Sequence, residues 1–198
     1  MGANALNGLL AEIASCRACA MCLPKEPRPM LRVASEARIL LAGQAPGRQA
    51  HESGVPWRDA SGDRLRDWLG ADAATFYDPA CFAIVPMGFC YPGSGRNGDL
   101  PPRAECRALW HARLLPLLSE VRLVLAVGEH AQAYHLAQRQ KNLTLTVAAW
   151  RAYLPGAIPL PHPSPRNASW LRKNPWFEQE LLPELRARVA AALPKPIA

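Results

Sequence analysis

The chain has 198 residues, of which 49% are apolar and 20% are charged. This length allows about 70% of the unfolded surface to be buried in one core, and the apolar fraction excludes an intrinsically disordered chain. Basic residues outnumber acidic ones by 23 to 16, and the net charge of +7 favours a polyanionic partner without identifying it. We therefore expect a single domain over residues 1–198.

Compartment and membrane association are also predicted from the sequence. No apolar run approaches the length of a membrane span, so we expect no membrane partner. The first residues lack the basic region and apolar run of a secretory leader. We therefore expect a cytoplasmic protein, whose six cysteines need a role other than disulfide formation because the cytoplasm is reducing.

Apolar periodicity divides the chain into alternating helices and short strands. Pro116 should shorten or kink the central helix, in which Leu109, Leu114 and Leu117 have the spacing of an apolar face. In chain order we expect a helix over 6–13, a strand over 38–42, a helix from about 61, a strand over 82–85, a helix over 103–118, a strand over 121–127, a helix from 128, a strand over 157–160 and a helix over 176–193.

Four apolar strands alternating with helices predict an α/β protein: a three-layer α/β/α sandwich with a central, mostly parallel four-stranded sheet. Ligands of such sheets bind beyond the carboxyl ends of the strands. The Gly- and Pro-rich loops after the first two strands and the loop over 161–167 would share that rim. We take this rim as the candidate active site.

Four of the six cysteines have the spacing of metal ligands. Cys16 and Cys19 form a C-x2-C pair, and fifteen residues separate Cys90 from Cys106. Zinc and an iron-sulfur cluster both accept four thiolates, so the spacing alone leaves both open. Cys22 can replace either member of the pair, because C-x2-C recurs there, and Cys81 is expected to be an ordinary buried thiol.

Three separated motifs then occur in a distinctive order: RILLAGQAPG over 38–47, GVPWRDASG over 54–62 and HPSPRN over 162–167. Together they resemble the uracil-DNA glycosylase superfamily, whose first motif follows the first strand and whose second begins His-Pro. The cysteine spacing resembles that of its iron-sulfur branch, often called family 4. The resemblance implies an α/β fold, removal of a damaged base from DNA, and a structural [4Fe-4S] cluster, or alternatively zinc, at Cys16, Cys19, Cys90 and Cys106.

The resemblance also implies roles in a base pocket. It places His162 as the donor to the carbonyl oxygen of the departing base, and Trp57 as the aromatic side chain that stacks on that base. A Trp packed in the core is the alternative for Trp57. The remaining residues expected to contact the base are Gly43, Ala45, Pro46, Gly47 and Pro86.

The chain departs from the family at three positions. Gln44 stands where the iron-sulfur branch has a carboxylate, and Ala45 where the most familiar members have Asp. Gln44 can orient water but cannot accept its proton, so Glu52 or Asp59 could supply the missing charge. Pro86 stands four residues before Cys90, where the family has an Asn that reads uracil, which weakens the expectation of uracil specificity.

Contacts with the DNA backbone are assigned to the last motif and the segment after it. Arg166 could also fill the gap that a flipped nucleotide leaves. The expected DNA-binding residues are Ser164, Arg166 and Asn167, followed by Arg172, Lys173 and Asn174 with Trp170 and Trp176 between them.

The sequence thus predicts a monomeric, monofunctional DNA glycosylase of base excision repair. It would flip uracil or a related deaminated base out of DNA and hydrolyse the N-glycosidic bond, with Gln44 and His162 as its catalytic residues. One alternative is a non-catalytic protein of the same fold that binds damaged DNA, because of the departures at Gln44, Ala45 and Pro86. Another is an unrelated binding domain stabilised by zinc or disulfides.

Overall fold

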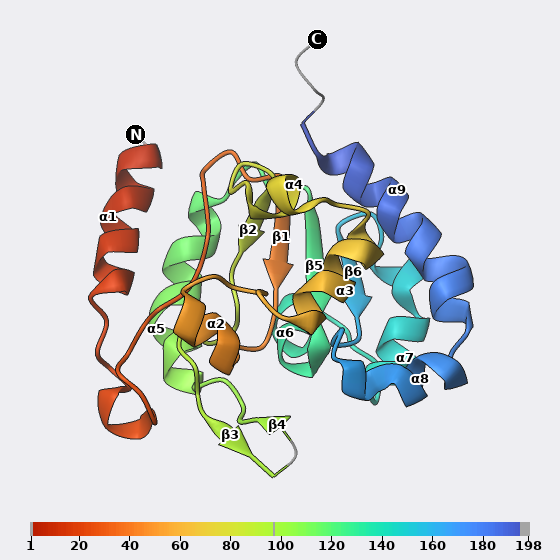
Figure 1. Cartoon of the computed structure of the whole chain (residues 1–198). Coiled ribbons are helices and arrows are strands. Elements are labelled where there is room, and N and C mark those ends of the chain that lie inside the picture. The colour runs from red at the N-terminus through yellow and green to blue at the C-terminus, as the bar shows by residue number, and fades with distance from the viewer. Residues whose placement is uncertain (1, 97, 195–198) are drawn as a thin grey trace.

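The computed structural model of the protein describes residues 2–96 and 98–194. At its centre is a four-stranded sheet with the strand order β2-β1-β5-β6, and every pairing within it is parallel (Figure 1). Helices flank this sheet, which confirms the predicted α/β fold. Its strands are β1 (Ile39–Ala42), β2 (Phe82–Ile84), β5 (Leu123–Val127) and β6 (Ala157–Leu160).

The helices predicted from periodicity are present, and shorter ones join them. The short helices α2, α4, α7 and α8 have five or six residues each, too few for a repeating apolar face to show in the sequence. The α-helices are α1 (Gly2–Ala14), α2 (Arg48–Ser53), α3 (Ala60–Leu69), α4 (Ala73–Tyr77), α5 (Ala104–Leu114), α6 (Gly128–His135), α7 (Leu143–Ala148), α8 (Ala168–Lys173) and α9 (Leu182–Ala192).

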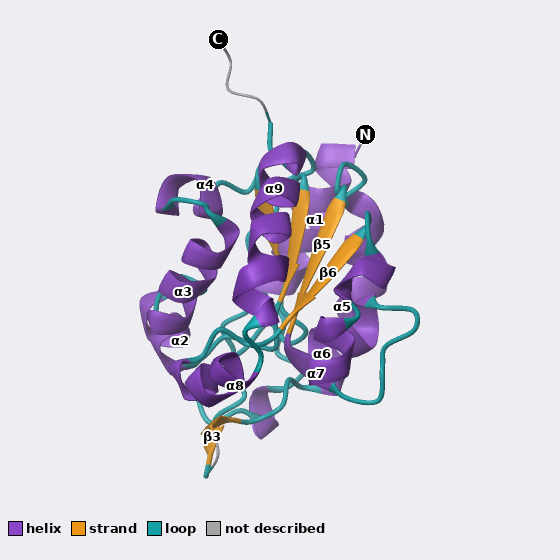
Figure 2. Ribbon diagram, turned by 90° about the vertical axis from the view of Figure 1, so that its right-hand side faces the viewer, coloured by secondary structure: helices purple, strands orange, loops and turns teal. Residues whose placement is uncertain are grey.

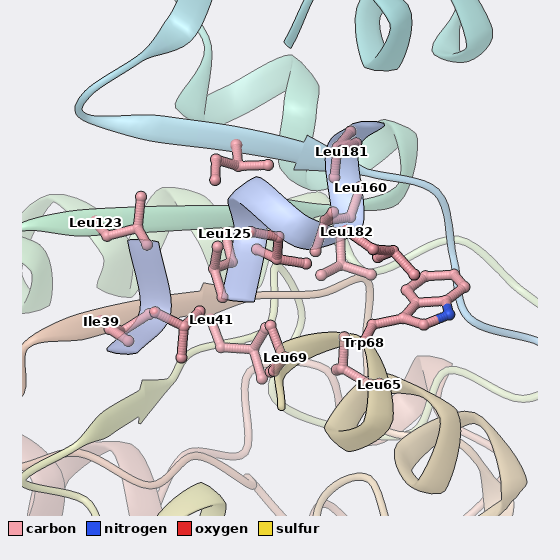
Figure 3. Packing of buried hydrophobic residues seen from close by; sticks show 14 of the residues in the cluster. Ile39, Leu41, Leu65, Trp68, Leu69, Leu123, Leu125, Leu160, Leu181 and Leu182 are labelled. Carbon is pink, nitrogen blue, oxygen red and sulfur yellow. The ribbon is translucent and has the colours of Figure 1, made fainter. Parts of the chain in front are cut away.

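The sheet is buried on both faces, as parallel sheets usually are. Side chains alternate along each strand, so that Ile39 and Leu41 pack on one face while Leu40 packs on the other. The first face meets α3 and α9, through Leu65 and Leu185 among others, and forms the larger core (Figure 3). The second face meets α1 and α5, so helices lie on both sides of the sheet (Figure 2).

Two predicted helices differ in detail from the observed ones. The first, α5, ends at Leu114 and continues as a 3-10 turn around Pro116. The assignment of Leu109 to its apolar face was wrong, because 46% of that side chain is exposed and it borders the cavity that the cysteines line. The C-terminal helix begins with a π-helical turn over Phe177–Leu181. Pro183, at the start of α9, has no N–H with which to form an α-helical hydrogen bond to the preceding turn.

The loops that follow the strands meet at one edge, as predicted for the rim. The Met87 N–H donates to the Gly43 carbonyl oxygen at 2.8 Å, and the Gly88 N–H donates to that of Gln44 at 2.9 Å. A two-stranded hairpin of β3 (Ser94–Gly95) and β4 (Gly98–Asp99), absent from the prediction, projects beyond this edge (Figure 1). Within the described residues, no helix is both long and apolar enough to cross a membrane.

Two histidines, His111 and the half-buried His135, pack against the same tyrosine. The His111 ring is inaccessible to solvent and stacks on Phe89, with ring centroids 5.4 Å apart and planes at 16°. Tyr134 makes edge contacts with both His111 and His135. Burial lowers the pKa of each histidine to about 4, so both imidazoles are neutral near pH 7.

We expect the protein to lose stability below pH 6.5, because the unfolded chain takes up protons on these histidines that the folded chain excludes. Between pH 6.5 and 4 the unfolded state binds more protons, so the free energy of unfolding falls as the pH falls. At pH 5 each histidine should account for a loss of about 1–2 kcal/mol in the free energy of unfolding. Urea unfolding of wild type and His111→Phe at pH 7 and pH 5 tests this; equal losses in both proteins would contradict it.

Candidate active site

Trp57 and His162 come from distant parts of the chain and lie side by side at the rim. Their ring centroids are 5.7 Å apart and their planes are inclined at 33°. Gly43, directly after β1, closes the same space: a Cβ there would lie 2.9 Å from the Trp57 ring. Glycine is therefore needed at position 43, and the structure brings together residues from all three sequence motifs.

The backbone of Trp57 is strained and held in place. Its φ of 57° lies in the left-handed region, which a bulky residue rarely adopts. The Trp57 carbonyl oxygen accepts hydrogen bonds from Arg66 Nη1 at 3.3 Å and from Tyr77 Oη at 3.2 Å. A Cβ on Gly62 would collide with that same oxygen. The surroundings thus impose a conformation that carries the Trp57 ring to His162 and Gly43.

His162 is fixed in one tautomer by its own loop. The Ser164 N–H donates to His162 Nδ1 at 3.2 Å, which leaves the ring proton on Nε2. Burial lowers the pKa of His162, although the nearby charges of Asp59 and Asp99 oppose this, so the ring is neutral near pH 7. A neutral imidazole with a proton on Nε2 can donate one hydrogen bond from that atom.

The loop that carries His162 is tied down from two directions. Arg64 Nη1 of α3 donates to the Ser164 carbonyl oxygen at 3.0 Å, and Asn167 Nδ2 donates to that of His162 at 2.7 Å. Asn167, predicted to contact DNA, thus supports the loop that carries His162. Arg166 lies against the β3–β4 hairpin, with Nη1 2.7 Å from the position of a Cβ on Gly98.

The first motif adopts the expected loop, but its amide is already engaged. Gln44 Nε2 donates to the Leu100 carbonyl oxygen at 2.9 Å, which links the loop to the segment after β4. Pro46 is buried, whereas Ala45 is half-buried. Pro86 is buried in the neighbouring loop and brings no side-chain hydrogen-bonding group there.

The two acids named from the sequence occupy different positions. Asp59 caps α3, its Oδ1 accepting from the Gly62 N–H at 2.8 Å, and its charge acts on His162. Glu52 is exposed on α2. A third acid, Asp99, was not identified from the sequence, and its negative charge also opposes the lowering of the His162 pKa.

The tryptophans near the C-terminal basic residues have structural contacts. Trp170 Nε1 donates to Thr144 Oγ1 at 2.8 Å, and the Trp170 ring makes edge contacts with Trp176 and Phe177. Both tryptophans pack against the larger core. Arg172 and Lys173 are exposed at the end of α8.

The four predicted ligand cysteines line one small cavity, together with apolar side chains such as Phe89. Burial raises the pKa of Cys90 to about 11 and that of Cys106 to about 12. The Phe89 N–H donates to Cys106 Sγ at 3.2 Å. No group of three His, Cys, Asp or Glu side chains among residues 2–96 and 98–194 is arranged to hold a metal ion.

A family model for the Uracil DNA glycosylase superfamily matches residues 32–186. The chain belongs to this superfamily. It is also similar to a solved structure from Methanosarcina acetivorans, described as a candidate uracil DNA glycosylase and determined by solution NMR. The sequences are 15% identical and the TM-score is 0.47, over 81% of this chain and 98% of that one.

Three polar residues that the sequence analysis did not identify hold Trp57 and the His162 loop in place: Arg64, Arg66 and Tyr77. Arg66 and Tyr77 hold the Trp57 carbonyl oxygen, and Arg64 holds the His162 loop. For Arg64 and Arg66 the only visible signal was polarity beside the apolar positions of the predicted helix, which is typical of any exposed helix face. Tyr77 lies in a short helix that the sequence did not reveal.

We expect Gly62→Ala to destabilise the protein and displace Trp57, because the new methyl group collides with the Trp57 carbonyl oxygen. The cost should be about 1–3 kcal/mol of unfolding free energy. The matched control is Gly8→Ala within α1, where a Cβ meets no atom within 4 Å and should stabilise the helix by about 0.5–1 kcal/mol. Equal thermal midpoints for the two variants would contradict this assignment.

Proposed function

We propose that the protein is a monofunctional DNA glycosylase that removes uracil or a related deaminated base. The contact between Trp57 and His162 beside Gly43 carries this proposal, because it places an aromatic ring next to a side chain that can donate a hydrogen bond. An extruded base needs a stacking partner, which contributes about 1–3 kcal/mol. The net charge of +7 suits a polyanion such as DNA.

The chemistry follows from the tautomer of His162. When the bond between C1′ of the sugar and the base nitrogen breaks, the electron pair leaves with the base and charge develops on its carbonyl oxygen. His162 Nε2–H would donate to that oxygen, and a fixed donor of this kind stabilises a transition state by a few kcal/mol. The glycines of the 43–47 loop let the backbone approach the base closely.

A second candidate function is recognition of damaged DNA without turnover. The Gln44 amide is engaged by Leu100, and neither Ala45 nor Pro86 brings a polar side chain to the pocket. A binding protein would hold a damaged base on Trp57 and release nothing. Base release by the wild-type protein distinguishes the two functions.

We expect His162→Ala to lower the single-turnover rate of base release by about 10²–10³-fold, because the donor to the leaving base is lost. The substrates are single- and double-stranded oligonucleotides that contain uracil, hypoxanthine or xanthine. The control is His130→Ala, an exposed histidine of α6 distant in sequence from the motifs. An unchanged rate in His162→Ala would refute the role of His162. If the wild-type protein forms no abasic product, the proposed glycosylase function is refuted.

We further propose that Cys16, Cys19, Cys90 and Cys106 hold a [4Fe-4S] cluster. Its support is that these thiols, which come from three segments of the chain, line one cavity. A backbone N–H bonded to a ligand sulfur, as at Cys106, is a common feature of cluster sites. The cluster would supply a covalent link between the N-terminal segment and α5, and its binding must displace the protons of the raised-pKa thiols.

Anaerobically purified protein should therefore absorb visible light and contain iron and sulfide. Cys16→Ala should lose this absorption and unfold at lower temperature, whereas Cys81→Ala should keep it, because Cys81 contacts Asp78 outside the cavity. If the purified protein is colourless and contains zinc, the four cysteines hold zinc and the proposed cluster is wrong. If Cys16→Ala keeps its full absorption and Cys22→Ala loses it, then Cys22 is the ligand in place of Cys16.

A further inference from the structure

The β3–β4 hairpin brings a carboxylate to the 43–47 loop. Asp99 Oδ2 lies 3.1 Å from the position that a Cβ on Gly47 would take, at the end of the 43–47 loop. At the start of that loop, Gln44 Nε2 binds the carbonyl oxygen of Leu100, the next residue after Asp99. The segment at Asp99 thus contacts the pocket loop at both ends, on the rim side of the sheet (Figure 1).

The Asp99 side chain is oriented by neighbouring hydroxyls. Ser94 Oγ donates to Asp99 Oδ1 at 2.8 Å, and Ser94 and Asp99 are partners in the hairpin register. Tyr91 Oη lies 2.7 Å from Ser94 Oγ, and Arg48, at the start of α2, interacts with both Tyr91 and Asp99. With Oδ1 occupied by Ser94, Oδ2 is the oxygen that faces Gly47.

Asp99 also lies close enough to His162 for its charge to act on the imidazole. Asp59 is the other acid with this property, but it is half-buried at the start of α3, where its Oδ1 caps the helix. Asp99 is exposed, so water reaches its carboxylate without a conformational change. Of these two carboxylates, Asp99 is therefore the better placed to accept a proton from a water molecule beside the His162 loop.

We propose that Asp99 is the catalytic residue that accepts a proton from the attacking water, a role that rests on the glycosylase function proposed above. The water oxygen forms a bond to C1′ while the bond from C1′ to the base nitrogen breaks and its electron pair leaves with the base. The water proton passes to Asp99 Oδ2, and the base, held by His162 Nε2–H, later takes a proton from solvent. The hairpin thereby supplies the carboxylate that Gln44 and Ala45 lack.

The test compares Asp99→Asn with wild type under single turnover, using the uracil, hypoxanthine or xanthine oligonucleotide on which wild type is most active. Asn retains an Oδ1 that can accept from Ser94, so the hairpin should persist, but it cannot take a proton. The rate should fall by about 10²–10⁴-fold. The Kd for an oligonucleotide with a tetrahydrofuran abasic analogue should stay within about threefold of wild type.

Two charge-matched variants complete the experiment. Asp67→Asn removes an exposed carboxylate on α3 that contacts Arg186, and its rate should match wild type. Asp59→Asn keeps the helix cap, since Asn also caps, and should lose less activity than Asp99→Asn.

Three results would overturn the role of Asp99 while leaving the glycosylase intact. They are an Asp99→Asn rate within about threefold of wild type, a larger loss in Asp59→Asn than in Asp99→Asn, and a loss of rate matched by an equal loss of DNA affinity. Absence of base release by wild type from every oligonucleotide would overturn the proposed function and the role of Asp99 with it.

Discussion

The Trp57 carbonyl oxygen accepts hydrogen bonds from Arg66 and Tyr77, and Gly62 leaves room for it. These contacts hold a bulky residue at a φ of 57°, a conformation that is unfavourable in isolation. The ring that results lies beside His162 and over Gly43. This constraint therefore places an aromatic ring between the first and last sequence motifs at the rim.

The parallel sheet determines where these residues meet. Because every strand pairing in it is parallel, the carboxyl ends of β1, β2 and β6 lie at one edge, where their loops meet. The hydrogen bonds from Met87 and Gly88 to the loop after β1 fix two of these loops together. Arg64 then connects α3 to the His162 loop, so the larger core, which includes residues of α3, also helps to hold that loop in place.

Much of the fold was predictable because apolar periodicity reports directly on burial. The strands at Ile39 and Leu123 and the apolar face of α3 followed from that pattern. The short helices did not, since five or six residues are too few for a helical repeat, and the β3–β4 hairpin did not, since its strands contain only Ser, Gly and Asp. Leu109 was misassigned because helical spacing indicates a face but not which neighbour, core or cavity, that face will meet.

The sequence by itself determined the alternation of strands and helices, the family motifs at Gly43, Trp57 and His162, and the spacing of the cysteines. Only the tertiary structure decided the strain at Trp57, the tautomer of His162, the engagement of Gln44 by Leu100 and the approach of Asp99 to Gly47. The physical reason is the range of the interactions. Periodicity and motif order are local along the chain, whereas hydrogen bonds and steric limits form between residues that only folding brings together.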